Sequence, residues 1–245
     1  MPIDDPGFEV ALRKLRVRDA VSADEEAVLR DAVSEVREFA AQKTIVQAGV
    51  VLTHSTLLLE GIACRYKDLS EGQRQIMELH VAGDFLDIHG FLLKQLDHHV
   101  GAMTPVRVAL VPHERLREIT ETQPHLARLL WFSTLIDAAV HREKILSIGR
   151  RSALARIAHI FCELLVRLRI VGLADDNGYA LPLTQADLAD STGLTSVHVN
   201  RMLKKLRDEN LLTFRGGEVA IGDWERLQRV AEFDPTYLHL ERRPR

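Results

Sequence analysis

The sequence predicts an α+β protein in which an antiparallel β-roll precedes a long helix and a compact helical region. Short β-branched runs separated by turn-forming stretches fill the N-terminal part of the chain. From Pro112 onward the apolar residues recur at spacings of three and four, and neither glycine nor proline occurs from His125 to Ile148. Two short helical patterns and a Gly-Gly hairpin signal follow within residues 183–221. We therefore expect three regions, at residues 1–113, 114–149 and 150–245.

Composition excludes several classes of protein. With 245 residues, 46% of them hydrophobic and 27% charged, the chain is expected to be globular and larger than one average domain. The two cysteines, Cys64 and Cys162, lie far apart in apolar sequence, so neither a disulfide framework nor a zinc knuckle is expected. Residues 1–9 lack the apolar core of a signal peptide, and no run approaches the roughly 18 uncharged apolar residues of a membrane span. We expect a protein of the reducing cytoplasm without membrane contact.

The charges are distributed unevenly. The whole chain has a formal net charge of −3, whereas residues 140–216 hold 12 Lys and Arg against 8 Asp and Glu. A basic C-terminal part joined to an acidic N-terminal part is typical of a protein in which only one part meets phosphate groups. Chance clustering on solvated faces is the alternative explanation.

The N-terminal region begins with a helix signal and continues as strands. Ser22 and Glu25 form a capping box ahead of an apolar run, which predicts a helix. Turn-type stretches at Asp68–Gly72 and Val81–Asp84 then separate β-branched segments, as in an antiparallel roll or barrel of about 100 residues. The expected strands are Thr44–Val46, Val50–Leu52, Thr56–Ile62, Gln75–Leu79 and Val106–Val111.

The helical pattern that follows is long. A helix from Glu114 to Ile148 would span roughly 50 Å if Pro124 only kinks it. Its apolar stripe either pairs with a second copy of the chain or lies in the core of its own domain, and the pattern does not separate the two. Gly149 ends the pattern, and Arg151–Val171 is expected to form another amphipathic helix before a polar loop. The residues we expect at a dimer interface are Leu126, Leu129, Leu130, Ile136 and Val140.

The segment Leu183–Leu212 has the features of a helix-turn-helix. Thr184 and Asp187 form a capping box at the start of a first helix, and Gly193 lies where a tight turn needs a residue that tolerates positive φ. Thr195 caps the second helix. The residues of that helix expected to face inward are Val199, Met202, Leu203 and Leu206.

The outer face of the second helix suits recognition of duplex DNA. Arginine pairs with guanine O6 and N7, asparagine pairs with adenine, and the first turns of a recognition helix reach the base edges. Alternating runs on either side of Gly216-Gly217 indicate a hairpin, which directly after a recognition helix would form a wing. We expect base contacts from Ser196, Val197, His198, Asn200 and Arg201, and phosphate contacts from Thr184, Thr195, Lys204, Lys205 and Arg215. The alternative is a ligand-binding or protein-interaction module whose helical hairpin does not read DNA.

From Val21 to Ile221 the chain resembles the Crp/Fnr family of bacterial transcription factors, most specifically in LTQADLADSTGLTSVHVNRMLKKLRDENLL. The resemblance implies a sensor domain of the cyclic-nucleotide-binding kind at 1–113, a dimerisation helix at 114–149 and a winged helix-turn-helix DNA-binding domain at 150–245. It also implies contacts with RNA polymerase. The family's base-reading arginine falls on Arg201, whereas Val197 stands where the family often has glutamate, so the base preference is expected to differ.

The resemblance does not identify an effector. A cyclic-nucleotide site in this fold needs a Gly-Glu turn and an Arg-Ser or Arg-Thr pair, yet Gly83–Met103 contains no arginine and Lys94 is its only fixed cation. We therefore expect cyclic AMP not to bind in the usual way. An iron–sulfur cluster is excluded because it needs four cysteine ligands. The residues we expect to line a pocket for an unknown small-molecule effector, if there is one, are Gly83, Asp84, Phe85 and Leu86.

Cofactor and enzyme functions lack a signal. The clustered histidines have no spacing typical of metal or haem ligands, so we expect no metal and no cofactor. We find no nucleophile–base pair and no phosphate-binding glycine loop, so we expect no catalytic residues and no enzyme activity. The histidines in question are His80, His89, His98 and His99.

Overall fold

The computed structural model describes residues 5–244. The chain divides into two compact units. The N-terminal unit comprises residues 1–66, 79–138 and 239–245, and the C-terminal unit comprises residues 67–78 and 139–238. Within the described residues no helix combines the length and the apolar character that crossing a bilayer requires.

Two helices precede the first strand. Helix α1 (Pro6–Arg18) is capped by Asp5, whose side chain accepts from the Gly7 amide, and has proline at its first position. The sequence analysis did not predict this helix. Helix α2 (Ala23–Asp31) begins at the predicted capping box, which is confirmed: Ser22 Oγ accepts from the Glu25 amide, and Glu25 accepts from the Ser22 amide.

The strands between residues 35 and 112 form two antiparallel sheets, as the α+β prediction requires. The first has the order β1-β7-β3, with Glu35 opposite Leu110 and His54 opposite Pro112. The second has the order β2-β6-β4-β5. Their bounds are β1 Glu35–Phe39, β2 Thr44–Val46, β3 His54–Glu60, β4 Ile62–Asp68, β5 Arg74–Val81, β6 His99–Ala102 and β7 Val106–Pro112, with the short helix α3 at Gly90–Leu93.

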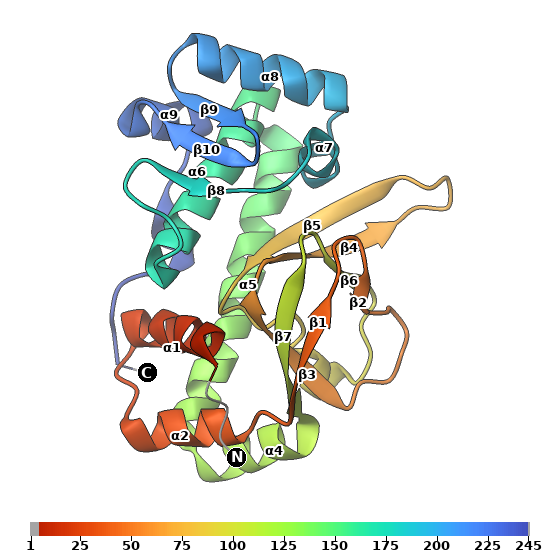
Figure 1. Cartoon of the computed structure of the whole chain (residues 1–245), viewed down its shortest axis with the longest axis vertical. Helices are drawn as coiled ribbons and strands as arrows, with labels where there is room; N and C mark the ends of the chain where they lie inside the picture. The colour runs from red at the N-terminus through yellow and green to blue at the C-terminus, as the bar shows by residue number, and fades with distance from the viewer. Residues whose placement is uncertain (1–4, 245) are drawn as a thin grey trace. The chain divides into compact units, whose positions relative to one another are not determined.

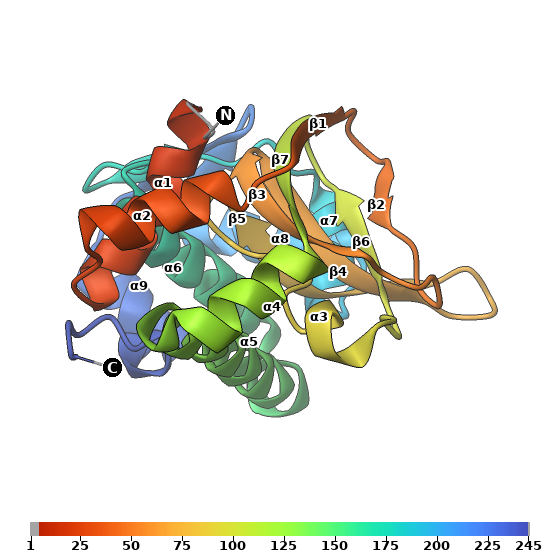
Figure 2. The same cartoon turned by 90° about the horizontal axis from the view of Figure 1, so that it is seen from below.

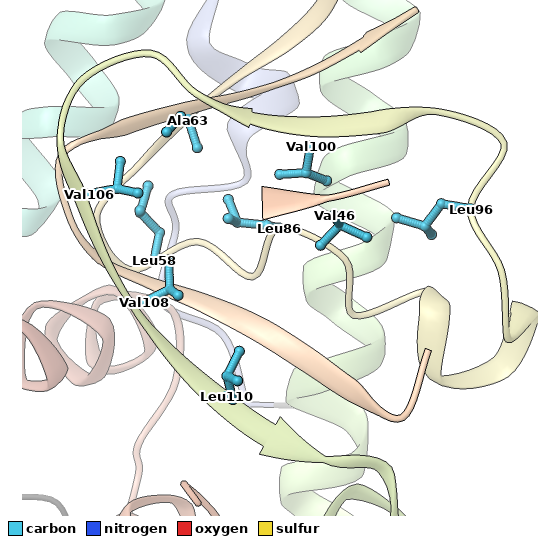
Figure 3. Close-up of a cluster of buried hydrophobic side chains, with 10 residues drawn as sticks. Val46, Leu58, Ala63, Leu86, Leu96, Val100, Val106, Val108 and Leu110 are labelled. Atoms are coloured by element: carbon cyan, nitrogen blue, oxygen red, sulfur yellow. The ribbon is translucent and has the colours of Figure 1, made fainter. Parts of the chain in front are cut away.

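Strands β3 and β7 are buried on both faces of the sheet β1-β7-β3. Since side chains alternate along a strand, Leu58 and Val108 point to one face while Leu57 and Ala109 point to the other. The first pair belongs to the aliphatic cluster inside the roll, which Figure 3 shows. The second pair packs against α1. In both views α1 and α2 lie on the side of this sheet away from β2 and β6 (Figure 1, Figure 2).

Several strand predictions were wrong. Val50–Leu52 forms a loop instead of a strand. Its Leu52 amide donates to the carbonyl of Lys94, at the end of α3, and not to a neighbouring strand. The expected strand Thr56–Ile62 is broken at Gly61, where φ is 88° and a Cβ would lie 2.4 Å from the Pro105 carbonyl oxygen. Strands β1, β4 and β6 were missed.

The long helical pattern forms two helices rather than one. Helix α4 (His113–Thr122) ends before Gln123, whose φ of −124° and ψ of 78° lie outside the helical region. Proline disfavours helical geometry in the residue before it, so the helix stops there instead of kinking. Helix α5 (Pro124–Arg150) then runs for 27 residues, which corresponds to about 40 Å.

The C-terminal unit contains helices and a small sheet. Ser152 caps helix α6 (Ala153–Val171), which ends at Gly172 with φ of 75°. Strand β8 lies in the stretch expected to be a loop, and it pairs with the predicted hairpin in the order β8-β10-β9. The remaining bounds are β8 Gly178–Ala180, α7 Gln185–Thr192, α8 Ser196–Asp208, β9 Leu212–Arg215, β10 Glu218–Ile221, α9 Trp224–Ala231 and a 3₁₀ turn at Pro235–Leu238.

Candidate nucleic-acid interface

Helix α7 starts where the sequence predicts. Thr184 Oγ1 accepts from the Asp187 amide at 3.1 Å, and Asp187 Oδ2 accepts from the Thr184 amide at 2.7 Å. This capping box satisfies two amides that a helix N-terminus leaves without an intrahelical partner. The Thr184 hydroxyl also donates to the Asp187 carboxylate. The cap therefore fixes the start of the first helix of the pair.

The turn between α7 and α8 rests on a left-handed residue. Gly193 has φ of 65° and ψ of 31°, and its amide donates to the Ala189 carbonyl. This left-handed conformation costs conformational free energy in residues with a Cβ, whereas glycine adopts it readily. Thr195 then caps α8 by accepting from the His198 amide at 3.3 Å. The turn follows the sequence prediction closely (Figure 1).

Helix α8 has a buried face and an exposed face. Val199, Leu203 and Leu206 are buried as predicted, and Met202 is half-buried. The opposite face holds the predicted DNA-contacting side chains. Val197 is 81% exposed, which is unusual for a large apolar side chain. Exposed on α8 or at its start are Thr195, Ser196, Val197, Asn200, Arg201, Lys204 and Lys205, while His198 is half-buried.

Two hydrogen bonds organise the exposed face. The Arg201 guanidinium donates to His198 Nε2 at 2.6 Å, one turn earlier on the helix. The Asn200 amide donates to Gln185 Oε1 at 3.1 Å. Gln185 is the first residue of α7, and the sequence analysis did not single it out. Its exposed position directly after the predicted cap was the signal that could have found it.

The wing is present next to this helix. Strands β9 and β10 pair from Leu212 opposite Ile221 to Arg215 opposite Glu218. Gly216 and Gly217 both have positive φ, as a two-residue hairpin turn requires. Arg215 is exposed at the end of β9, beside that turn. The predicted hairpin is therefore confirmed, and the Arg215 side chain is exposed to solvent beside its turn.

The five predicted dimer residues are buried within the single chain. All five are at most 9% exposed in the single chain, so they have little surface left for a partner. Three of them pack into one cluster with Leu116 and Ile119 of α4. An apolar stripe looks the same in sequence whether it faces its own domain or a second copy, and here Leu126, Leu129 and Leu130 face their own domain. The buried residues are Leu126, Leu129, Leu130, Ile136 and Val140; the exposed apolar residues of α5 are Trp131, Leu135, Ile145 and Leu146.

The four predicted effector residues do not share one environment. Gly83, Asp84 and Phe85 line a cavity of the N-terminal unit. Leu86 is fully buried and points into the aliphatic cluster of the roll, so it does not belong with the other three (Figure 3).

The roll interior carries charged groups of its own. Arg65 is buried and donates to the Leu86 carbonyl and to Asp137 Oδ2, both at 2.8 Å. Asp87 accepts from the amide and hydroxyl of Thr56 at 2.5 and 3.0 Å. Burial raises the pKa of Asp87 to about 6, against the opposing effect of those hydrogen bonds. Sequence reasoning placed no arginine here because Arg65 comes from β4, a strand that it missed.

Two of the predicted histidines, His89 and His98, are neighbours in the structure. The rings of His89 and His98 lie 5.5 Å apart, and His98 Nδ1 lies 2.9 Å from Asp97. Across residues 5–244 no group of three or more His, Cys, Asp or Glu is placed to hold a metal ion.

Comparison with known proteins identifies both units of this architecture. Residues 36–123 match the family described as the cyclic nucleotide-binding domain, and residues 155–230 match the Crp-like helix-turn-helix domain. The transcriptional activatory protein AadR of Rhodopseudomonas palustris is 32% identical over 176 residues, 71% of this chain and 72% of that protein. The transcriptional activator protein FnrL of Cereibacter sphaeroides is 26% identical over 214 residues, 86% of each chain. The structure of FixK2 from Bradyrhizobium japonicum is 26% identical with a TM-score of 0.73, over 81% of this chain and 97% of that one.

Proposed function

The chain belongs to the Crp/Fnr family of transcription regulators and binds DNA through its helix-turn-helix, and on this premise we propose that it reads a two-fold symmetric operator as a cytoplasmic homodimer. The exposed face of α8 carries the proposal. A dimer bound to its operator would present its surface to RNA polymerase, in keeping with relatives that are named as transcriptional activators.

Base reading is assigned to the first two turns of α8. Arg201 is exposed and is held by His198, which orients the guanidinium for a bidentate contact with guanine. Ser196 and Asn200 offer hydroxyl and amide groups beside it. Val197 is exposed and apolar, which suits the methyl group of thymine better than the amino group of cytosine.

Phosphate contacts are assigned to residues at the margins of that face. Lys204 and Lys205 are exposed one turn beyond Arg201. Arg215 extends from the wing, and the hydroxyls of Thr184 and Thr195 lie at the two helix N-termini. Such contacts add affinity and its salt dependence without reading sequence.

Selection of bound sequences from random duplex DNA tests this assignment. The wild-type chain should enrich a two-fold symmetric site. Arg201→Ala should lose or relax one base position in each half-site, whereas Arg207→Ala, in the last turn of the same helix, should keep the preference. Unchanged preference in Arg201→Ala would contradict the assignment.

Dimerisation is assigned to the exposed seam of α5. Trp131, Leu135 and Ile145 are 67%, 51% and 72% exposed. Together with Ala138 and Arg142 they follow the alternating spacing of three and four that lines a two-stranded coiled coil. Large apolar side chains on an exposed seam favour a second copy of the helix as their partner.

Sedimentation distinguishes this seam from the buried stripe. Leu135→Glu should yield monomers that stay folded. Leu92→Glu, at a still more exposed leucine on α3, should remain dimeric. A dimeric Leu135→Glu variant would refute the seam.

We further propose that cyclic AMP does not bind inside the roll in the usual way. Aliphatic side chains including Leu58, Leu86 and Val108 occupy the interior (Figure 3). The Asp87 carboxylate would repel a phosphate there, and the buried Arg65 is already engaged by the Leu86 carbonyl and Asp137. Titration calorimetry with cyclic AMP should show no binding at millimolar concentration.

A further inference from the structure

A cavity lies beneath α1 in the N-terminal unit. It measures about 880 Å³ when the part open to solvent is counted. Leu57 lines it, and Leu57 points to the face of the β1-β7-β3 sheet opposite to Leu58. The cavity therefore lies on the other face of this sheet from the aliphatic cluster of the roll.

The walls of this cavity are mainly apolar. Phe8 and Leu12 come from α1, Leu116 from α4 and Leu129 from α5, so three helices enclose the space together with Leu57 of β3. Pockets of this kind hold the apolar body of a small ligand, and a few polar groups at the margin set its orientation. Only a small part of that volume is enclosed by protein on all sides. The body that fits is accordingly a ring or a short chain.

The polar margin carries two cations from α1. Lys14 and Arg18 both line the cavity and lie four residues apart, on the same side of the helix. Lys14 pairs with Asp84, which lies in the turn at the cavity wall. Arg18 is only 5% exposed, and its guanidinium lies 5.6 Å from the centroid of the Phe132 ring.

We propose that this cavity binds a small monocarboxylate with an apolar body. The body occupies the space between Phe8, Leu12 and Leu129, and the carboxylate meets Arg18, with Lys14 exchanging Asp84 for the ligand. A guanidinium at the edge of an apolar space pairs with a carboxylate in a bidentate, charge-assisted manner that a neutral ligand cannot reproduce. This proposal goes beyond DNA recognition and does not depend on it, because the cavity lies wholly within the N-terminal unit.

Titration calorimetry of the full chain without DNA tests the site. Three probes separate its parts: benzoate, its neutral analogue benzamide, and acetate, which lacks the apolar body. Benzoate should bind at least tenfold more tightly than either of the others. Equal affinity for benzoate and benzamide, or no measurable binding of benzoate at millimolar concentration, would overturn the proposal.

Two matched variants locate the site. Arg18→Met removes the guanidinium but keeps an apolar stem, and it should weaken benzoate at least tenfold while leaving benzamide within twofold. Arg13→Met makes the same change at an exposed arginine of α1 and should leave benzoate binding unchanged. Equal effects of the two substitutions would place the carboxylate elsewhere and refute the site. If Arg18→Met does not fold, the wild-type comparison of benzoate with benzamide still decides.

Discussion

Replacing Gly193 isolates the contribution of one backbone conformation to the helix-turn-helix. A Cβ at this position would lie 3.7 Å from Gln75 Oε1 and 3.9 Å from the Arg156 guanidinium, which are ordinary contact distances. No steric clash therefore adds to the effect, and only the left-handed φ of 65° remains. Gly193→Ala should lower the free energy of unfolding by about 1–2 kcal/mol. Gly193→Asn should lose less, because asparagine tolerates this conformation better.

The measurement follows urea unfolding of the C-terminal unit by fluorescence. Trp224 of α9 lies in that unit and Trp131 lies in the other, so all variants carry Trp131→Phe to leave one reporter. An alanine variant as stable as its parent would show that the turn does not need a left-handed residue. An asparagine variant as unstable as alanine would show that the cause is something other than the backbone conformation.

Three further perturbations test other parts of the structure. Thr184→Ala should cost about 0.5–2 kcal/mol in urea unfolding through loss of the α7 cap, whereas Thr184→Ser should not; equal losses would contradict the cap. Lys204→Ala should reduce the slope of log affinity against log salt by about 0.9 per lost phosphate contact in mobility-shift titrations, with the selected sequence unchanged. The hydrogen bond with Glu25, aided by Asp19, raises the pKa of His125 against the effect of burial, so its stabilisation is complete below the unfolded pKa of about 6.5 and is lost as pH rises through the higher folded value. The urea midpoint of the wild type should therefore fall more between pH 5.5 and 8.5 than that of His125→Gln, and equal falls would refute the assignment.

The helix-turn-helix could be predicted because its determinants are local. Thr184, Gly193 and Thr195 act on amides or dihedral angles within a few residues, so their spacing in the sequence already specifies the caps and the turn. The contact of Asn200 with Gln185 could not be predicted in the same way, because it joins two helices whose angle only the fold sets.

The N-terminal unit was harder to predict because tertiary contacts override local patterns. Helix α1 has short apolar runs between charges, and only Asp5 with Pro6 marked its start. Strand β4 contains Arg65, which reads as exposed in sequence but is buried through bonds to carbonyls and to Asp137. The stripe of α5 illustrates a further limit, since periodicity identifies an apolar face without identifying what covers it.

Helix α5 has a consequence for how the molecule could be divided. Its residues up to Ala138 belong to one compact unit and those from Ala139 to the other, although the chain runs through without interruption. Arg151, a buried residue of the second unit just after α5, donates to the carboxylate of Glu143 on α5. The sequence analysis predicted a domain boundary after Gly149. A fragment that begins there would contain the buried Arg151 guanidinium but lack the Glu143 carboxylate that balances its charge. A transplantable DNA-binding fragment should therefore begin within α5 and keep the residues of that helix from Ala139 onward.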